Sequence, residues 1–442
     1  MKTLRLFRML SSSRSSGIAA FVLPVVAFAV VTALLLIVLG GAFAFFGWSG
    51  SGVDDYKYLA SIALALLVVP LLTLGGSAAR LSARRRDDRL STLRLLGATP
   101  ALVARLTVIE SAALALVGAL VGIVVYVALV PAVGLIPFRG EALGGSIWLA
   151  PWVVGIVVLG VAALAALSAA IGLRGVIVSP LGVRTRQTTP RPHWVRLTLG
   201  VVAVIVVCTA MTLLRADAGV ITVLLVFGLG FGLTIAVLNL AGPFVLRLVA
   251  KAGVRRAKTP QRLLAARGIL ESPKAAWRQV SGVAMTSFIA VFAGVGIAVT
   301  NSMSSGSDSL EFVFDIRTGV IITLVASFLM VACSVGVNQA SAILDRRDLY
   351  LSLDRLGMPV KTMDVARTRA VMSPLRWVSI GSALTAAVVM LPLTGMALLQ
   401  DPASLAIIAA CLVVGIVVVW LGLRATRPVL TRVLAEPERA VA

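Results

Sequence analysis

Long apolar blocks constrain this chain more than any other sequence feature. They run to about twenty residues or more, the length that a helix needs to cross the roughly 30 Å hydrocarbon core of a bilayer. With 59% hydrophobic and 13% charged residues, a soluble protein would have too little polar surface to stay dissolved. We therefore predict an all-α polytopic membrane protein with ten transmembrane helices, at about 18–47, 57–79, 102–134, 148–172, 196–214, 219–246, 278–300, 317–342, 370–396 and 403–423.

The distribution of basic residues tests this count, because Lys and Arg collect in the loops that stay in the cytoplasm. Placing both termini inside puts 36 of the 40 Lys and Arg in predicted cytoplasmic segments and leaves Lys57, Arg139, Arg215 and Arg317 outside. The same rule explains the formal charge of +22 without a nucleic-acid partner. We expect a multi-pass protein of a bacterial cytoplasmic membrane with both termini cytoplasmic and only short external loops.

The sequence also repeats at a constant offset of 260 residues, which aligns polar and glycine positions of its two ends. Asp55 aligns with Asp315, Lys57 with Arg317, and Gly97 with Gly357. Both copies begin inside, so we predict a parallel duplication of a four-helix unit. The predicted division is a first unit with an N-terminal interfacial helix (1–190), a central two-helix insert with a basic loop (191–258), and a second unit with a leading amphipathic helix (259–442).

Each unit carries a leucine-rich elbow after its second span, on the predicted cytoplasmic side. Residues at three-residue spacing form one stripe on a short helix, and a glycine suited to a left-handed position ends it. Thr99 and Pro100 are predicted as the N-cap and first residue of the next helix. Such a stripe either packs on its own bundle or the membrane surface, or docks on a cytoplasmic partner. Two copies favour a partner with two-fold symmetry. The stripes are Leu90, Leu93 and Leu96 before Gly97, and Tyr350, Leu353 and Leu356 before Gly357.

The segment from Arg86 to Glu110, RDDRLSTLRLLGATPALVARLTVIE, resembles the FtsX/MacB-like permeases of ABC transporters. The second unit keeps Leu356-Gly357 but has Met358-Pro359 in place of Ala-Thr. The ten-helix layout looks like the BceB-type antimicrobial-peptide permeases, although only residues 301–316 stand where those have a large extracellular domain. The family pattern is filled here by Asp88, Leu93, Leu96, Gly97, Ala98, Thr99, Glu110, Gly118 and Gly122.

The resemblance implies a permease subunit that works with a separate ABC-type ATP-binding subunit, as a homodimer on each permease chain, and with membrane lipids. ATP and Mg²⁺ would bind that partner, and the cargo would be lipid-like, a peptide or an amphiphilic drug, exported or extracted. The elbows would be coupling helices. The ATPase-coupling residues implied are Arg86, Asp88, Leu90, Leu93, Leu96, Gly97, Thr99, Arg346, Asp348, Tyr350, Leu353, Leu356 and Gly357.

The residues offer no catalytic chemistry of their own. No phosphate-binding Gly-x-x-x-x-Gly-Lys-(Ser/Thr) and no His-Glu-x-x-His, Gly-x-Ser-x-Gly or Cys-x-x-Cys occurs. The cysteines lie inside apolar blocks and are expected to be inert, and His193 has no neighbours suited to a metal site. We therefore predict no catalytic, cofactor or metal residue in this chain and no enzyme activity.

A few polar residues lie in or beside the predicted spans. A carboxylate at membrane depth marks function by default, so Glu110 is a candidate, unless it reaches headgroups or pairs with Arg105. The external rim pairs Asp55/Lys57 and Asp315/Arg317 would be interfacial anchors or a gate. Gly118 and Gly122 would allow close helix contact. Residues 259–277, with Thr259 as N-cap, and residues 4–10 are predicted interfacial amphipathic helices.

Two other function classes stay open at this point. A stand-alone secondary transporter or flippase would need titratable residues near the membrane midplane, and only Glu110 qualifies. A non-transporting signalling scaffold would need no cargo at all. The sequence carries no signature of the cargo or of its direction.

Overall fold

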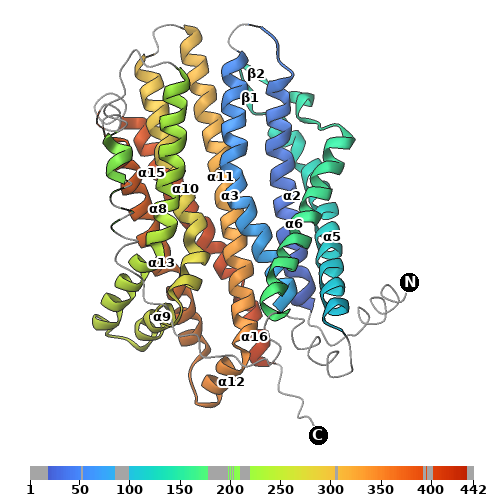
Figure 1. Ribbon diagram of the computed structural model, residues 1–442, viewed down its shortest axis with the longest axis vertical. Helices are drawn as coiled ribbons and strands as arrows, with labels where there is room; N and C mark the ends of the chain where they lie inside the picture. Colours follow the sequence, from blue (N-terminus) through green and yellow to red (C-terminus); the bar gives the residue numbers. More distant parts are fainter. Residues whose placement is uncertain are drawn as a thin grey trace. The chain divides into compact units, whose positions relative to one another are not determined.

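The computed structural model describes residues 18–50, 53–84, 99–177, 198, 200, 202, 204–209, 220–303, 307–391, 395 and 402–435 (Figure 1). The predicted interfacial helix at residues 4–10 lies outside the described residues, as does most of the predicted span 196–214. The chain divides into two compact units. The first unit comprises Met1–Gln187 with Met330–Asp345, and the second comprises Thr188–Leu329 with Arg346–Ala442. The predicted insert therefore groups with the second unit, while the three-part division itself stays a prediction.

Among the described residues, four long helices lie wholly within the first unit: α2 (Ile18–Phe46), α3 (Val53–Arg84), α5 (Pro100–Gly134) and α6 (Pro151–Ile177). Helix α2 packs along α5 and α3, and α6 packs on α5 and α3. Gly118 and Gly122 lie where α5 meets α2, and a Cβ atom there would come within 2.6 Å of Phe28 Cβ and 2.7 Å of the Ala29 carbonyl oxygen, respectively. The prediction of close helix contact at these glycines is confirmed.

A short hairpin joins α5 to α6 through β1 (Pro137–Phe138), β2 (Glu141–Ala142) and the 3₁₀ turn η1 (Gly144–Ile147). Its two turn residues, Arg139 and Gly140, have φ of 54° and 75°, which is the left-handed geometry of a tight hairpin turn. The buried hydroxyl of Tyr126 donates to the Ile147 carbonyl oxygen at 2.9 Å and accepts from the Leu149 N–H at 3.1 Å. One side chain thus fastens this connection to the end of α5.

The second unit contains the remaining helices, with α10 packed along α13 and also against α8 and α15. The side chain of Phe288 in α10 is fully buried in this core, and Trp277 Nε1 donates to Asn239 Oδ1 of α8 at 2.8 Å. The helices are α8 (Val220–Arg255), α9 (Pro260–Glu271), α10 (Pro273–Met303), α11 (Ser307–Asp345, whose last part belongs to the first unit), α12 (Arg347–Arg355), α13 (Val360–Val389), α15 (Pro402–Arg424) and α16 (Arg427–Ala435).

Within the described residues, seven helical segments are long and apolar enough to cross a membrane. Of the other predicted spans, 57–79 falls inside α3 and 370–396 overlaps α13. The chain is an all-α polytopic membrane protein, and the count of ten spans stays a prediction. The seven segments are Pro24–Phe46, Arg105–Gly134, Gly144–Ala170, Gly230–Arg255, Pro273–Val295, Glu311–Leu344 and Ala409–Thr431.

The helix predicted over residues 259–277 is present but ends earlier than predicted. Helix α9 ends at Glu271, Ser272 has a non-helical backbone (φ −146°, ψ 78°), and α10 starts at Pro273. A proline disfavours the helical conformation of the residue before it, which accounts for the break at Ser272. Thr259 does hold the N-cap position with Pro260 after it, but its side chain makes no capping hydrogen bond.

Candidate functional site

Of the coupling residues predicted in the first elbow, only Thr99 lies within the described residues. Arg86, Asp88, Leu90, Leu93, Leu96 and Gly97 all lie outside the described residues. Thr99, the next member of the predicted set, is the N-cap of α5: its Oγ1 accepts from the Leu102 N–H at 3.4 Å, and Pro100 follows at the first helical position. The predicted start of this helix is therefore confirmed.

The second elbow is the helix α12, which ends in a complete left-handed capping turn. Gly357 has φ +78°, its N–H donates to the Asp354 carbonyl oxygen at 2.8 Å, and the Met358 N–H donates to that of Leu353 at 3.0 Å. This hydrogen-bond pair is the Schellman pattern, in which a glycine takes the left-handed position without a Cβ clash. The turn redirects the chain from α12 into α13 within a few residues.

Leucines on α12 remain open to the surroundings. Leu356 exposes 82% of its surface and Leu349 exposes 51%, whereas Tyr350 and Leu353 are half-buried. Helix α12 contacts α16, whose Leu430 is fully buried. Tyr350 and Leu353 of the predicted stripe are thus partly covered by their own unit, whereas Leu356 at its end is exposed.

The polar members of the second elbow lie at its entrance. Arg346 precedes α12 and its guanidinium binds the Glu271 carboxylate of α9 at 3.4 Å, with both side chains exposed. Asp348 is exposed in the first turn of α12, where a negative charge complements the helix dipole. These contacts join the elbow to the end of α9.

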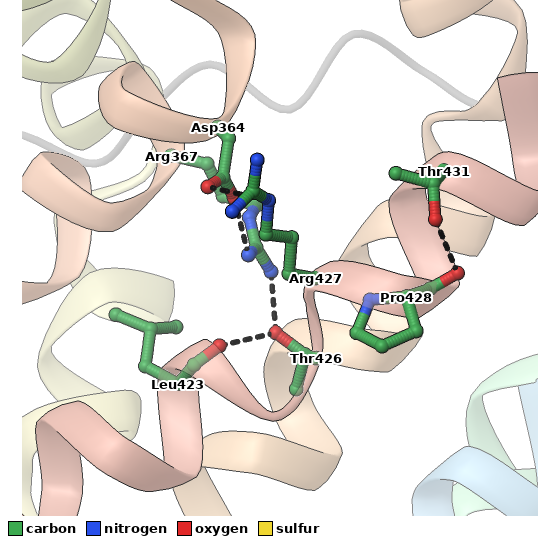
Figure 2. A network of polar contacts seen from close by, with 7 residues as sticks. All are labelled: Asp364, Arg367, Leu423, Thr426, Arg427, Pro428 and Thr431. Atoms are coloured by element: carbon green, nitrogen blue, oxygen red, sulfur yellow. Dashed lines mark hydrogen bonds and ion pairs between the residues drawn. The ribbon is translucent and has the colours of Figure 1, made fainter. Parts of the chain in front are cut away.

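A buried arginine connects the helix after the elbow to the α15–α16 junction (Figure 2). Arg367 of α13 is 7% exposed; its guanidinium donates to Thr426 Oγ1 at 2.6 Å and to Asp364 Oδ1 at 2.8 Å. Arg427, the first residue of α16, reaches the other oxygen of Asp364 at 3.8 Å. We call Asp364, Arg367, Thr426 and Arg427 the Arg367 network.

The sequence reasoning missed the Arg367 network. Its only local signal is the i, i+3 spacing of Asp364 and Arg367, which suits an ion pair on any helix. At the 260-residue offset the first unit has Ala104 and the buried Thr107 instead. The two units therefore differ in charge at the base of the helix that follows the elbow.

Tyr350 of α12 stands in the electrostatic field of this network. Burial raises the pKa of its phenol above the ordinary value of 10.0, and the Asp364 carboxylate acts in the same direction. The guanidinium groups of Arg367 and Arg346 oppose this shift in the pKa of Tyr350. The phenol of Tyr350 in the elbow is therefore within electrostatic range of the Arg367 network.

The remaining predicted polar residues are dispersed. Glu110 is half-buried in α5, about three turns after Pro100. At the start of α3, Asp55 is exposed and Lys57 binds Asp54 at 3.2 Å rather than Asp55. In α11, Asp315 is 4% exposed and Arg317 is half-buried. The two predicted rim pairs therefore differ in burial, since Asp55 is exposed and Asp315 is buried.

The chain was compared with known proteins. Residues 76–180 match the family model described as FtsX-like permease C-terminal. This stretch contains the first elbow, α5 and α6, the part of the chain that carries the Leu-Gly-Ala-Thr motif and Glu110. No match to the chain was found among curated proteins.

Proposed function

We propose that this chain, whose residues 76–180 match the FtsX-like permease C-terminal model, is a permease subunit of an ABC transporter that couples ATP hydrolysis by a separate ATP-binding subunit to the export or extraction of an amphiphilic cargo. The cargo would be a lipid-like molecule, a peptide or a drug. The permease would lie in a bacterial cytoplasmic membrane with its elbows on the cytoplasmic side. A homodimer of the ATP-binding subunit would serve one permease chain, one ATPase protomer on each elbow.

The exposed leucines of α12 carry this proposal. Leu349 lies on α12 and Leu356 is its C-cap, and the other apolar face of this short helix is already half covered by its own unit. An apolar residue that exposes this much surface at a helix end is stabilised when a groove on another protein removes it from water. The family match over the first elbow supports the same role for Leu90, Leu93 and Leu96.

The Arg367 network supports a route for the motion. A push on α12 is transmitted through the Gly357 turn to α13 and through α16 to α15, because Arg367 and Asp364 tie α13 to Thr426 and Arg427. A buried, charge-assisted network resists separation of the helices that it joins. We infer that α13, α15 and α16 move as one body when the elbow is displaced.

Co-purification with the ATP-binding subunit tests the proposal. We expect the wild-type permease to retain the ATPase in detergent, and the double substitution Leu353→Asp with Leu356→Asp to lose it, because two carboxylates cannot enter an apolar groove. Ser352→Asp is the matched control, since it adds a charge at another exposed position of α12. Loss of the ATPase with the control alone, or its full retention by the leucine variant, would overturn the coupling role.

Cargo-dependent ATP hydrolysis separates a transporter from a scaffold. In proteoliposomes the complete assembly should hydrolyse ATP faster when its cargo is present, and the leucine variant should not respond. Transport that proceeds without any ATPase and stops with Glu110→Gln would instead establish a secondary transporter.

A further inference from the structure

Two adjoining cavities in the second unit have contrasting walls. The first is an apolar cavity of ≈ 420 Å³ between α8, α10 and α13. The second, of ≈ 580 Å³, lies between the C-terminal part of α8, α9 and α13. Trp377 lines both cavities, so they are neighbours. Each volume falls within the range of about 300–1,000 Å³ that is usual for ligand pockets.

Four arginines line the second cavity: Arg256 directly after α8, Arg262 of α9, and Arg369 and Arg376 of α13. Among the described residues, no acidic side chain lines it. All four arginines are exposed, and none forms an ion pair with another of the described residues. Unpaired guanidinium groups that converge on one cavity favour a phosphate or carboxylate ligand, which they bind through paired hydrogen bonds.

The first cavity is lined almost entirely by aliphatic and aromatic side chains. Its walls include Val237, Ala241 and Val245 of α8, Trp277 of α10, and Leu384 and Val388 of α13. Such a lining gives a hydrocarbon chain dispersion contacts and no place for a charge.

The predicted membrane spans place the two cavities at successive depths. The arginine cavity is lined by residues 249–269 and 368–377, which lie around the predicted cytoplasmic ends of the spans 219–246 and 370–396, so this cavity is predicted to lie at headgroup level. The apolar cavity is lined by residues 237–245 and 378–388, inside predicted spans. Trp277, Trp377 and Trp420 line the cavities close to the predicted membrane interface. Tryptophans are enriched at such interfaces.

We propose that the two cavities together bind one anionic phospholipid of the inner leaflet, with its phosphate on the four arginines and an acyl chain in the apolar cavity. The order of charge and apolar lining matches the order of headgroup and chain in such a lipid. The bound lipid is separate from the cargo and from the elbow. The site therefore does not depend on the proposed transport function.

Native mass spectrometry of the full chain in detergent tests the site. The probes are dioleoyl phosphatidylglycerol, dioleoyl phosphatidylcholine, which has the same chains and no net charge, and inorganic phosphate. We expect phosphatidylglycerol to bind roughly tenfold or more tightly than phosphatidylcholine, in line with the gain from charge-assisted hydrogen bonds. Inorganic phosphate should compete only weakly because it lacks the chain.

Matched substitutions separate a built site from general positive charge. The pair Arg256→Gln with Arg262→Gln should weaken phosphatidylglycerol binding roughly tenfold. The pair Arg255→Gln with Arg267→Gln removes the same charge from the last residue of α8 and from α9, but neither residue lines the cavity, so binding should be unchanged. If both double variants lost the same amount of phosphatidylglycerol affinity, the arginines would act only through their general positive charge, and the proposal would be overturned.

A leucine in the apolar cavity tests the other half of the site. Gly381 lines this cavity, and a Cβ atom there would meet no atom within 4 Å, so Gly381→Leu can occupy cavity space without a clash at Cβ. It should weaken phosphatidylglycerol binding several-fold, whereas Gly232→Leu, equally free of clashes and outside both cavities, should not. Unchanged lipid binding by Gly381→Leu, or inorganic phosphate binding as tightly as the lipid, would contradict the proposal that an acyl chain occupies the apolar cavity.

Discussion

The hydroxyl oxygens of Ser287 in α10 and Ser379 in α13 lie 2.8 Å apart in the buried core of the second unit. At the 260-residue offset the first unit has Ala27 and Ala119 in α2 and α5, and both are fully buried. The same two helices of each unit are packed along one another. These correspondences agree with the duplication, which stays a prediction. The hydrogen bond between Ser287 and Ser379 has no counterpart at Ala27 and Ala119 of the first unit.

A double-mutant cycle at Ser287 and Ser379 should show a small favourable coupling. Interhelical hydrogen bonds in membrane proteins average about 0.6 kcal/mol, because a lone serine finds other partners in its own helix. We expect Ser287→Ala and Ser379→Ala each to lower stability slightly and the double variant to lose less than the sum. Chemical unfolding in mixed micelles measures this, and additive losses would show that the contact carries no energy.

Gly122→Leu should destabilise the first unit. A Cβ atom at this position would lie 2.7 Å from the Ala29 carbonyl oxygen, so α2 and α5 must separate, at a cost of about 1–3 kcal/mol or more. Gly155→Leu on α6 is the control, because its Cβ meets nothing within 4 Å. Thermal unfolding of both variants should show a lower midpoint for Gly122→Leu only; equal midpoints would argue against tight α2–α5 packing.

Asp364→Asn should destabilise the second unit much more than Arg427→Gln. The first change leaves Arg367 buried without its counter-charge, for which a loss of about 3 kcal/mol is typical. The second removes only an exposed partner of the same carboxylate, worth less than about 1 kcal/mol. Thermal unfolding compares the two, and similar losses would mean that the Arg367 network is not the structural tie inferred above.

Alkaline pH should weaken the elbow through Tyr350. Because burial raises the pKa of Tyr350, the folded chain keeps this proton to higher pH than the unfolded chain, and the contribution of Tyr350 to stability declines as pH rises above about 10. Tyr350→Phe cannot ionise, so its stability should fall less steeply in that range. Thermal unfolding as a function of pH measures both slopes, and identical slopes would contradict the shift.

Local chemistry made parts of this structure predictable. Thr99-Pro100 specifies a helix start and Gly357 specifies a left-handed helix end, since each depends on neighbours within a few residues. The break at Ser272 also follows from a local rule, because Pro273 disfavours the helical conformation of the residue before it.

Long-range relationships were not predictable from the sequence. Arg367 and Thr426 are 59 residues apart, and the sequence cannot show that these two side chains meet. Likewise, the positive-inside rule accounts for each of the four cavity arginines singly, so the sequence gives no sign that they share one cavity. Their convergence depends on how α8, α9 and α13 pack.

Site-specific photo-crosslinking at position 356 tests the central claim most directly. A photoreactive residue in place of Leu356 should form a covalent product with the separate ATP-binding subunit in intact cells. The same residue in place of Leu384, an exposed leucine of α13 within a predicted span, should not. The account is contradicted if position 356 yields no such product while the ATPase is present, or if a membrane-impermeant reagent added outside the cell modifies it.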